Sequence, residues 1–324
     1  MTTQARVIAI ANQKGGVAKT TTAINLAAAL AMRGKRLLLI DIDPQANLTS
    51  GIGLKGQAQD AGTIYQALLG AADEPHAFIV PSAIERLAVI PADRQLTGAE
   101  IELVTVDERE DRLRRIIGPL RGSFDYIFID SPPSLGLLTL NALVAADSVL
   151  IPLNCEYFAL EGIADLMATI DGVRAALNPD LLVEGVLLTM ADERTNLGQQ
   201  VSGSVREFFG DRVFQTVIPR NVRLGEAPSH GMSILLYDPR SRGAEAYTAL
   251  GDEFLQREHA GGTPEPVAQA DGDAGLSEPF DSARASERER VARTERGGGV
   301  PASERAGGPA GAKPPGEKGE ADHG

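Results

Sequence analysis

The sequence predicts an α/β fold: a single domain with a mostly parallel sheet and helices on both faces, followed by a disordered C-terminal tail. Three observations support this prediction. Apolar strand-like runs alternate with helical patterns between residues 6 and 257, a loop rich in glycine and lysine follows the first strand, and the composition changes sharply near residue 260. We place the domain at residues 1–258 and the tail at residues 259–324.

Strands are expected at short runs that are almost entirely apolar, as in a parallel sheet buried on both faces. These runs are residues 7–11, 36–41, 87–91, 126–130, 148–153, 182–190 and 213–218. Helical spacing of apolar residues predicts helices at 20–33, 95–117, 134–146, 159–177, 196–209 and 243–257. Such sheets bind ligands at the carboxyl ends of their strands, so motifs at those ends carry the functional information.

The segment NQKGGVAKTTT, residues 12–22, joins the first strand to the first helix. Glycines let backbone N–H groups turn toward an anion, and the N-terminus of the following helix adds partial positive charge. The strict pattern G-x-x-x-x-G-K-[ST] fails, because Gln13 and Ala18 occupy its two glycine positions. The deviant pattern K-G-G-x-x-K-[ST] fits, so the sequence predicts a phosphate site in a P-loop NTPase domain.

The loop residues have distinct expected roles. Lys19 lies against the β- and γ-phosphates, and the Thr20 hydroxyl holds Mg²⁺. Lys14 is surplus for a nucleotide held by one subunit, because Lys19 already serves that nucleotide. We therefore expect Lys14 to reach a second nucleotide across a homodimer interface. The residues predicted to contact the phosphates are Gly15, Gly16, Val17, Ala18, Lys19, Thr20 and Thr21.

Two further strands end in carboxylates. Asp41 and Asp43 follow the second strand in IDIDPQ, and we expect a Mg²⁺-side or structural role for Asp41. Asp130 ends the run YIFID, the Walker B arrangement in which a buried strand delivers a carboxylate to the metal. The next residues, 131–133, are Ser-Pro-Pro and predict an irregular turn beside the γ-phosphate.

These motifs resemble those of the ParA/MinD family of deviant P-loop ATPases, and specifically the short ParA (Soj-like) branch that segregates chromosomes and plasmids. The resemblance covers residues 6–257 and rests on five blocks in order: KGGVAKTTT, LLLIDIDPQAN, YIFIDSPPSLG, YFALEG and VIPRNVRLGEAPSHG. Ala18 departs from the glycine most common in the family, at a position that the deviant pattern leaves free. We expect nucleotide binding to survive this difference.

The resemblance implies roles for further residues. Asp43 orients or activates the water that attacks the γ-phosphate, and Pro219 and Asn221 flank the adenine. No N-K-x-D guanine signature occurs, so ATP is favoured over GTP. The arginines implied in non-specific contact with DNA phosphates are Arg194, Arg220 and Arg223. Positions implied near the dimer or partner interface are Tyr157, Glu161 and residues 226–230.

Composition limits these expectations. The formal net charge is −13, so any DNA contact has to come from a local basic patch. The region from residue 261 onward has few large apolar residues and cannot offset the entropy of ordering, which predicts disorder. Cys155 has no second cysteine to pair with, which excludes disulfides and CxxC sites. No signal peptide or membrane-spanning run is evident, so we expect a cytoplasmic protein without membrane attachment. The resemblance implies that it associates with the nucleoid.

The resulting hypothesis is a weak, Mg²⁺-dependent ATPase that dimerises with ATP, binds DNA non-specifically and drives chromosome or plasmid segregation, with hydrolysis stimulated by a ParB-like partner. The alternatives are a MinD-like ATPase at a membrane surface and an orphan relative that positions a protein cargo or division machinery. The tail lacks the basic amphipathic helix of MinD-type relatives, which disfavours the first. A metal or cluster carrier would need paired cysteines, and a non-hydrolysing module would not need both Asp43 and Asp130.

Overall fold

The structure is a computed structural model that describes residues 4–56, 62–70, 74–155, 159–191 and 195–259. Within them, a seven-stranded sheet has the order β3-β4-β2-β5-β1-β6-β7. Its neighbouring strands are parallel except β3 and β4. All described residues belong to one compact unit. The predicted α/β domain with a mostly parallel sheet is confirmed, whereas residues 260–324 of the predicted tail lie outside the described residues.

The strands agree closely with the apolar runs of the sequence. All predicted strands except the last correspond to an observed one, and the short antiparallel β3 was not predicted. The strands are β1 (Arg6–Ile10), β2 (Leu37–Asp41), β3 (Val80–Pro81), β4 (Leu87–Ile90), β5 (Tyr126–Asp130), β6 (Ser148–Asn154) and β7 (Leu182–Thr189).

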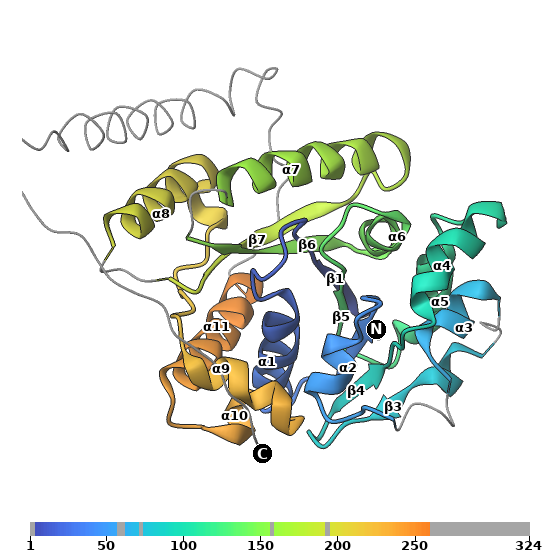
Figure 1. Cartoon of the computed structure of the whole chain (residues 1–324), viewed down its shortest axis with the longest axis horizontal. Helices are drawn as coiled ribbons and strands as arrows, with labels where there is room; N and C mark the ends of the chain where they lie inside the picture. The colour runs from blue at the N-terminus through green and yellow to red at the C-terminus, as the bar shows by residue number, and fades with distance from the viewer. Residues whose placement is uncertain (1–3, 57–61, 71–73, 156–158, 192–194, 260–324) are drawn as a thin grey trace, which may run out of the picture. The chain divides into compact units, whose positions relative to one another are not determined.

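Helices cover both faces of the sheet, with α1 and α11 on one face and α6 and α7 on the other (Figure 1). The α-helices are α1 (Lys19–Ala31), α2 (Asn47–Gly51), α3 (Ile64–Leu69), α4 (Leu96–Glu102), α5 (Arg112–Ile117), α6 (Leu137–Ala145), α7 (Ala159–Ala176), α8 (Asn196–Phe209), α9 (Val222–Glu226), α10 (Ile234–Tyr237) and α11 (Arg242–His259). Short 3-10 helices are η1 (Pro75–Phe78), η2 (Leu103–Thr105), η3 (Gly118–Leu120), η4 (Gly210–Arg212) and η5 (Ala227–His230). None of the described helices combines the length and hydrophobicity of a membrane span.

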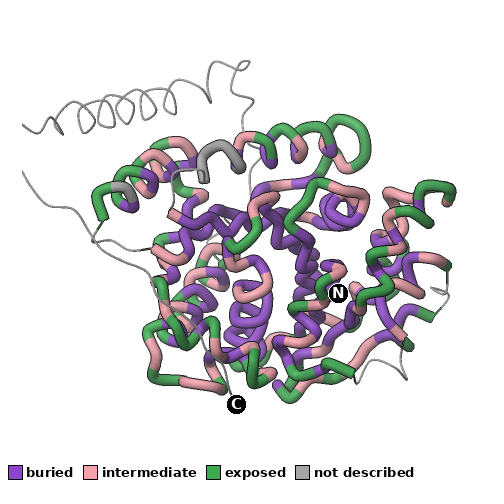
Figure 2. The backbone as a smooth tube through the Cα atoms, viewed as in Figure 1, coloured by how far each residue is buried: buried purple, intermediate pink, exposed green. Residues whose placement is uncertain are grey.

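Each face of the sheet has its own hydrophobic core, because alternate strand residues point to opposite faces. On one face, Ile8 packs in a cluster with Leu26 of α1 and Phe254 of α11. On the other, Val7 packs in a cluster with Leu138 of α6. Figure 2 shows the central strands and much of α1 as buried, with exposed residues confined to the outer helices and loops. Burial on both faces explains why the strand sequences are apolar throughout rather than alternating.

The single helix predicted at residues 95–117 is wrong. The segment forms α4, the 3-10 helix η2 and α5, and Glu108 between them has a left-handed backbone with φ of 53°. Residues 107–111 are all charged, so this stretch offers no apolar side chain to the core. The apolar residues on either side, such as Leu103 and Leu113, are buried in the same cluster. The chain therefore breaks at the charged stretch so that both ends can pack.

The predicted strand at residues 213–218 is also wrong as a regular strand. The segment runs beside β7, but its ladder consists of isolated parallel bridges at Val213 and Pro219. Two backbone N–H groups in its middle donate to the carboxylate of Glu253 on α11, at 2.7 and 2.8 Å. Because these donors serve a helix side chain, the segment cannot use them in a continuous ladder.

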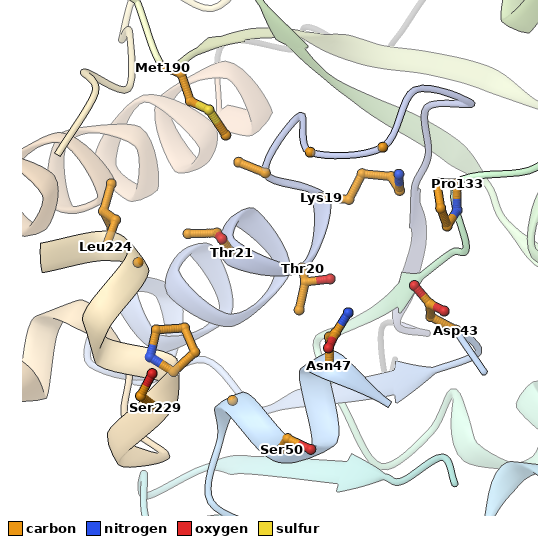
Figure 3. A pocket seen from close by; sticks show the side chains of 16 residues that line it. Lys19, Thr20, Thr21, Asp43, Asn47, Ser50, Pro133, Met190, Leu224 and Ser229 are labelled. Atoms are coloured by element: carbon orange, nitrogen blue, oxygen red, sulfur yellow. The ribbon is translucent and has the colours of Figure 1, made fainter. Parts of the chain in front are cut away.

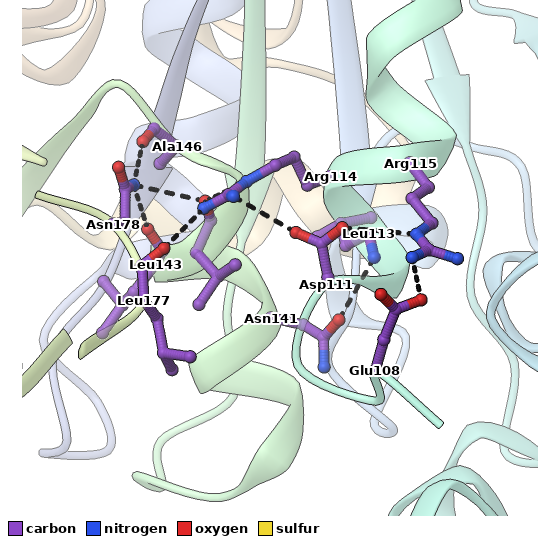
Figure 4. A network of polar contacts seen from close by, with 11 residues as sticks. Glu108, Asp111, Leu113, Arg114, Arg115, Asn141, Leu143, Ala146, Leu177 and Asn178 are labelled. Atoms are coloured by element: carbon purple, nitrogen blue, oxygen red, sulfur yellow. Dashed lines mark hydrogen bonds and ion pairs between the residues drawn. The ribbon is translucent and has the colours of Figure 1, made fainter. Parts of the chain in front are cut away.

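The C-terminal end of α6 is fixed by side chains from neighbouring elements (Figure 4). Arg114 of α5 donates to the carbonyl of Val144 from Nε at 2.9 Å and from Nη2 at 2.7 Å. Asn178, which follows α7, donates from Nδ2 to three carbonyls at this end of the helix. Asn141 of α6 accepts a hydrogen bond from the backbone N–H of Leu113 at 3.1 Å. The bonds from Arg114 and Asn178 satisfy carbonyl groups that the end of a helix leaves without a partner. The bonds of Arg114 and Asn141 also connect α6 to α5.

Candidate nucleotide-binding site

The register of three neighbouring strands brings the predicted site residues to one edge of the sheet. β5 lies between β1 and β2, and Asp130 is paired with Ile10 on one side and with Asp41 on the other. The loops that leave these strands therefore start at the same level. This is the carboxyl edge at which parallel sheets bind ligands.

The glycine- and lysine-rich loop connects β1 to α1 as predicted. Gly16 has φ of 73° and Ala18 has φ of 67°, so both adopt the left-handed conformation that turns the chain into the helix. No side chain caps the N-terminus of α1, so its first N–H groups are available to bind an anion. Thr189 of β7 donates from Oγ1 to the carbonyl of Val17 at 3.1 Å and ties the loop to the sheet.

Thr20 and Asp130 form the part of the site that fits a divalent cation. Thr20 Oγ1 donates to Asp130 Oδ2 at 2.7 Å. The other carboxylate oxygen, Oδ1, is buried and has no hydrogen-bond partner among the described residues. Burial, reinforced by the charge of Asp41, raises the pKa of Asp130 well above its usual range. A buried carboxylate oxygen without a donor beside a hydroxyl matches the oxygen ligands that Mg²⁺ prefers.

Lys19 places a cation beside these carboxylates. Its side chain is buried, and Nζ donates to the carbonyl of Lys14 at 3.2 Å. Burial lowers the pKa of Lys19, while the charges of Asp130 and Asp43 oppose this shift. The ammonium group of Lys19 therefore lies close to Asp130 and Asp43. A phosphate bound by the loop would contact the same ammonium group.

The two aspartates after β2 differ in their surroundings. Both oxygens of Asp41 are engaged, because Oδ1 accepts from the N–H of Asp43 at 3.1 Å and Oδ2 accepts from the N–H and Oγ1 of Thr49 at 2.9 and 2.7 Å. Burial raises the pKa of Asp41 to about 6. Among the described residues, the carboxylate of Asp43 accepts one hydrogen bond, from the N–H of Gln45 at 2.9 Å. The Asp43 side chain also lines a cavity beside Lys19. Of the two predicted roles for Asp41, the geometry favours the structural one.

A cavity of about 530 Å³ lies over the N-terminus of α1 (Figure 3). Asp43 and Pro133 line one end beside Lys19, and Met190 and Leu224 line the opposite end. The first end is polar and suits phosphates, whereas the second is apolar and suits a flat ring. Among the described residues, the lining is Gly15, Gly16, Ala18, Lys19, Thr20, Thr21, Asp43, Asn47, Ser50, Gly51, Pro133, Met190, Leu224, Gly225, Pro228 and Ser229.

Four residues predicted for nucleotide contact or catalysis do not line this cavity. Lys14 lies outside it, with its Nζ 3.5 Å from Asn154 Oδ1 at the end of β6. The side chain of Val17 is buried in the loop. Pro219 bridges to Ala191 beyond β7, and Asn221 caps α9 by accepting from the N–H of Arg223 at 2.8 Å. The roles given to these residues stay predictions.

The structure describes two of the three predicted DNA-binding arginines, and both are exposed. Arg194 lies outside the described residues, as does Tyr157 of the predicted partner interface. Arg220 is exposed. Arg223 is also exposed, and it forms ion pairs with Glu226 at 2.8 Å and with Asp238 at 3.5 Å. Arg223 is therefore already paired with acids, as loop arginines often are.

Sequence reasoning missed the apolar end of the cavity. Leu224 and Pro228 belong to the block VIPRNVRLGEAPSHG, so the segment was found, but these two cavity-lining residues were not predicted to contact the nucleotide. Met190 follows β7 and has a left-handed backbone with φ of 48°. Asn47 and Ser50 enter the site because α2 begins just after Asp43. Only tertiary packing reveals these contacts, since α2 packs against α1 and against η5, which directly follows α9.

The fold and the loop together define a P-loop nucleotide-binding protein of the deviant Walker A type. Residues 5–183 match the family model described as an AAA domain. The chain is 58% identical over 248 residues to the sporulation initiation inhibitor protein Soj of Bacillus subtilis, a match that covers 76% of this chain and 97% of that protein. It is 57% identical over 257 residues to the chromosome partitioning protein ParA of Myxococcus xanthus, covering 79% of this chain and 90% of the relative. The chain belongs to the ParA/Soj family of chromosome-partitioning P-loop ATPases.

Solved structures agree with this assignment. Cobyrinic acid a,c-diamide synthase of Mycobacterium smegmatis, with bound ATP analogue and magnesium, is 38% identical with a TM-score of 0.69, covering 82% of this chain and 100% of that one. The cell division ATPase MinD of Pyrococcus furiosus is 26% identical with a TM-score of 0.64, covering 78% and 98%. The resemblance inferred from the sequence motifs is confirmed.

The backbone of Ala18 generates a stability prediction. An L-residue in the left-handed region costs about 1–2 kcal/mol; glycine avoids this cost but loses more conformational entropy when the chain folds. Ala18→Gly should therefore raise the free energy of unfolding by roughly 0.5–1 kcal/mol and the Tm by about 2 °C. The measurement is thermal unfolding without nucleotide. The same change at Ala28, inside α1, should lower the Tm, and a lower Tm for Ala18→Gly would contradict the assigned strain.

Proposed function

We propose that the protein is a nucleotide-dependent switch whose ATPase cycle controls binding to DNA. The observation that carries this proposal is the convergence of Lys19, Thr20 and Asp43 on one cavity, with Asp130 hydrogen-bonded to Thr20. ATP and Mg²⁺ are the nucleotide and metal of this family, and the residues present fit both. Thr20 and Asp130 would hold Mg²⁺, which supplies neutralising charge at the β- and γ-phosphates when bound.

The remaining residues of the site position the nucleotide and the attacking water. The backbone N–H groups of the loop and of the first turn of α1 bind phosphate oxygens, and Lys19 pairs with their charge. Met190 and Leu224 provide apolar surfaces for the base. Asp43 orients the water, since its carboxylate lines the phosphate end and accepts only one hydrogen bond from the described chain. Phosphoryl transfer depends mainly on such positioning and charge stabilisation.

Lys14 supports the proposal of an ATP-dependent homodimer. Its side chain is half-buried and lies outside its own nucleotide cavity, although it belongs to the same loop. A lysine that does not reach the nucleotide of its own subunit is suited to the nucleotide of a second copy. We propose that two subunits meet at the carboxyl edge and that each Lys14 contacts the phosphates held by the other.

The proposed DNA contact rests on a local arginine rather than on overall charge. The chain is acidic, with a net charge of −13, so its field does not attract DNA. Arg220 is exposed and follows the segment that packs beside β7. Dimerisation would bring two copies of this region together and double the number of phosphate contacts. We propose non-specific binding to nucleoid DNA by the dimer, and release when a ParB-like partner stimulates hydrolysis.

Asp43→Ala should separate binding from turnover. Removal of the carboxylate should lower ATP turnover about 100-fold or more, because the water loses its orienting group, while ATP affinity changes little. Phosphate release and binding of a fluorescent ATP analogue measure the two effects. Asp93→Ala is the matched control, because Asp93 also follows a strand and accepts a hydrogen bond from the N–H two residues later, at 3.0 Å, yet does not line the cavity. Turnover that stays near wild type in Asp43→Ala would remove the proposed role.

Arg220→Ala should weaken DNA binding without affecting ATP binding. We expect about tenfold weaker retention of DNA by the ATP-bound protein, and a slope of log K against log salt that is smaller by about 1 for each DNA phosphate that the variant fails to bind. Gel retardation over a range of salt concentrations measures both quantities. Arg223→Ala is measured in parallel, because the ion pairs of Arg223 with Glu226 and Asp238 have to break before its guanidinium can bind a DNA phosphate. Equal affinity of wild type and Arg220→Ala at every salt concentration would contradict the assignment.

A further inference from the structure

The carboxylate at the end of β2 accepts three hydrogen bonds, two of them from one threonine of α2. Asp41 Oδ2 accepts from the backbone N–H of Thr49 at 2.9 Å and from its Oγ1 at 2.7 Å. Asp41 Oδ1 accepts from the backbone N–H of Asp43 at 3.1 Å. Asp41 is 0% exposed and Thr49 is 3% exposed, so these bonds are shielded from water and strengthened by the low dielectric. The side chain of Asp41 therefore joins α2 to the backbone of Asp43.

The hydroxyl of Thr49 has a second partner on the neighbouring strand. It accepts a hydrogen bond from the backbone N–H of Ala92 at 2.9 Å. Ala92 follows β4, which is paired with β2 so that Ile40 lies opposite Ile90. A hydroxyl has one proton, and here that proton goes to Asp41 while the oxygen accepts from Ala92. The direction of the hydroxyl is therefore fixed on both sides, and Thr49 connects the loops that leave β2 and β4.

The N-terminus of α2 depends on the same carboxylate. Ala46 at the N-cap position has a left-handed backbone and no side-chain oxygen that could accept a hydrogen bond. The N–H of Thr49, the third residue of the helix, is satisfied by Asp41 instead. Asn47 and Ser50 of the same helix line the nucleotide cavity (Figure 3). Asp41 therefore caps the helix that forms one wall of that cavity.

Asp43 is held mainly through its backbone. Its N–H donates to Asp41 at 3.1 Å, and its carbonyl accepts from the N–H of Ala46 at 2.8 Å. Its carboxylate accepts one bond within the described chain, from the N–H of Gln45. Phosphoryl transfer depends on positioning, and a small displacement of a catalytic group lowers the rate strongly. Any group that fixes the backbone of Asp43 therefore also determines where its carboxylate lies at the phosphate end of the cavity.

We propose that Thr49 is a positioning residue for ATP hydrolysis. Its hydroxyl fixes the carboxylate of Asp41 against the loop after β4, and Asp41 in turn fixes the backbone of Asp43. Thr49 does not line the nucleotide cavity, so it acts on the reaction through Asp43 and not by contact with ATP. This inference rests on the proposed function, because it requires that Asp43 orients the attacking water.

The test measures ATP turnover of the full-length protein with Mg²⁺. Thr49→Val keeps the shape of the side chain but can neither donate to Asp41 nor accept from Ala92, and Thr49→Ser restores the hydroxyl. Thr49→Ala, which also lacks the hydroxyl, takes the place of Thr49→Val if that variant does not fold. Thr63→Val is the matched control, because Thr63 is also buried and its hydroxyl bonds at 2.6 Å to Gln66 at the start of α3 rather than to Asp41. Binding of a fluorescent ATP analogue and thermal unfolding are measured for every variant.

We expect Thr49→Val to lower kcat about tenfold while KM and the affinity for the analogue stay within about twofold, because a displaced Asp43 affects the water and not the binding of ATP. Thr49→Ser should recover most of the lost kcat. Thr63→Val should keep the wild-type kcat although its Tm falls. A wild-type kcat in Thr49→Val, or a loss that Thr49→Ser does not recover, overturns the proposal. So does failure of both Thr49→Val and Thr49→Ala to fold, since the hydroxyl then serves folding.

A double variant separates action through Asp43 from a general structural effect. Adding Thr49→Val to Asp43→Ala should cause no further loss of phosphate release in a single turnover, because the carboxylate that Thr49 positions is already absent. A further loss of about tenfold, as expected for independent effects, overturns the positioning role and leaves the role of Asp43 intact. If Asp43→Ala alone turns over ATP as the wild type does, the proposed role of Asp43 fails, and this inference fails with it.

Discussion

The parallel register of β1, β5 and β2 is the constraint on which the rest of the site depends. It sets Ile10, Asp130 and Asp41 at one level, so the phosphate loop, the metal-side carboxylate and the loop that carries Asp43 all begin at the same edge. Register in a buried parallel sheet is held by apolar packing on both faces. Here two separate cores fix it, one against α1 and α11 and the other against α6 and α7.

This convergence concentrates charge and strain at the edge. Asp41 and Asp130 are fully buried next to each other in register, and burial raises the pKa of both. Three non-glycine residues around the site, Ala18, Ala46 and Met190, have left-handed backbones. Such residues persist only where the surrounding structure holds them, and they gather at functional sites. The conformation of the loops at the carboxyl edge is therefore maintained by the packing of the sheet and the helices around them.

The sequence was informative where function depends on short contiguous motifs. The loop, Thr20, Asp43 and Asp130 were found because their neighbours along the chain define their chemistry, and the structure brings them together. The apolar end of the cavity was not found, because Leu224 and Met190 meet only through tertiary packing. The helix at 95–117 and the strand at 213–218 failed for a related reason. Each has adequate local periodicity, but a charged stretch in one and Glu253 in the other redirect the backbone.

The carboxyl edge of the sheet also explains how the proposed ATPase cycle can act as a switch. The phosphate end of the nucleotide cavity is lined by Asp43 and Pro133, which belong to loops leaving different strands. Lys14 lies outside that cavity in its own subunit, so in the proposed dimer the site is complete only when a second subunit supplies one. Occupancy by ATP, closure of two subunits and readiness for hydrolysis then become one event.

The most direct test is sedimentation velocity of Asp43→Ala and of the double variant Lys14→Ala/Asp43→Ala, each with ATP and Mg²⁺. The account predicts that Asp43→Ala sediments as a dimer, whereas the double variant binds the fluorescent ATP analogue but sediments as a monomer. A dimer of equal stability in both, or a monomer in Asp43→Ala under saturating ATP, would contradict it.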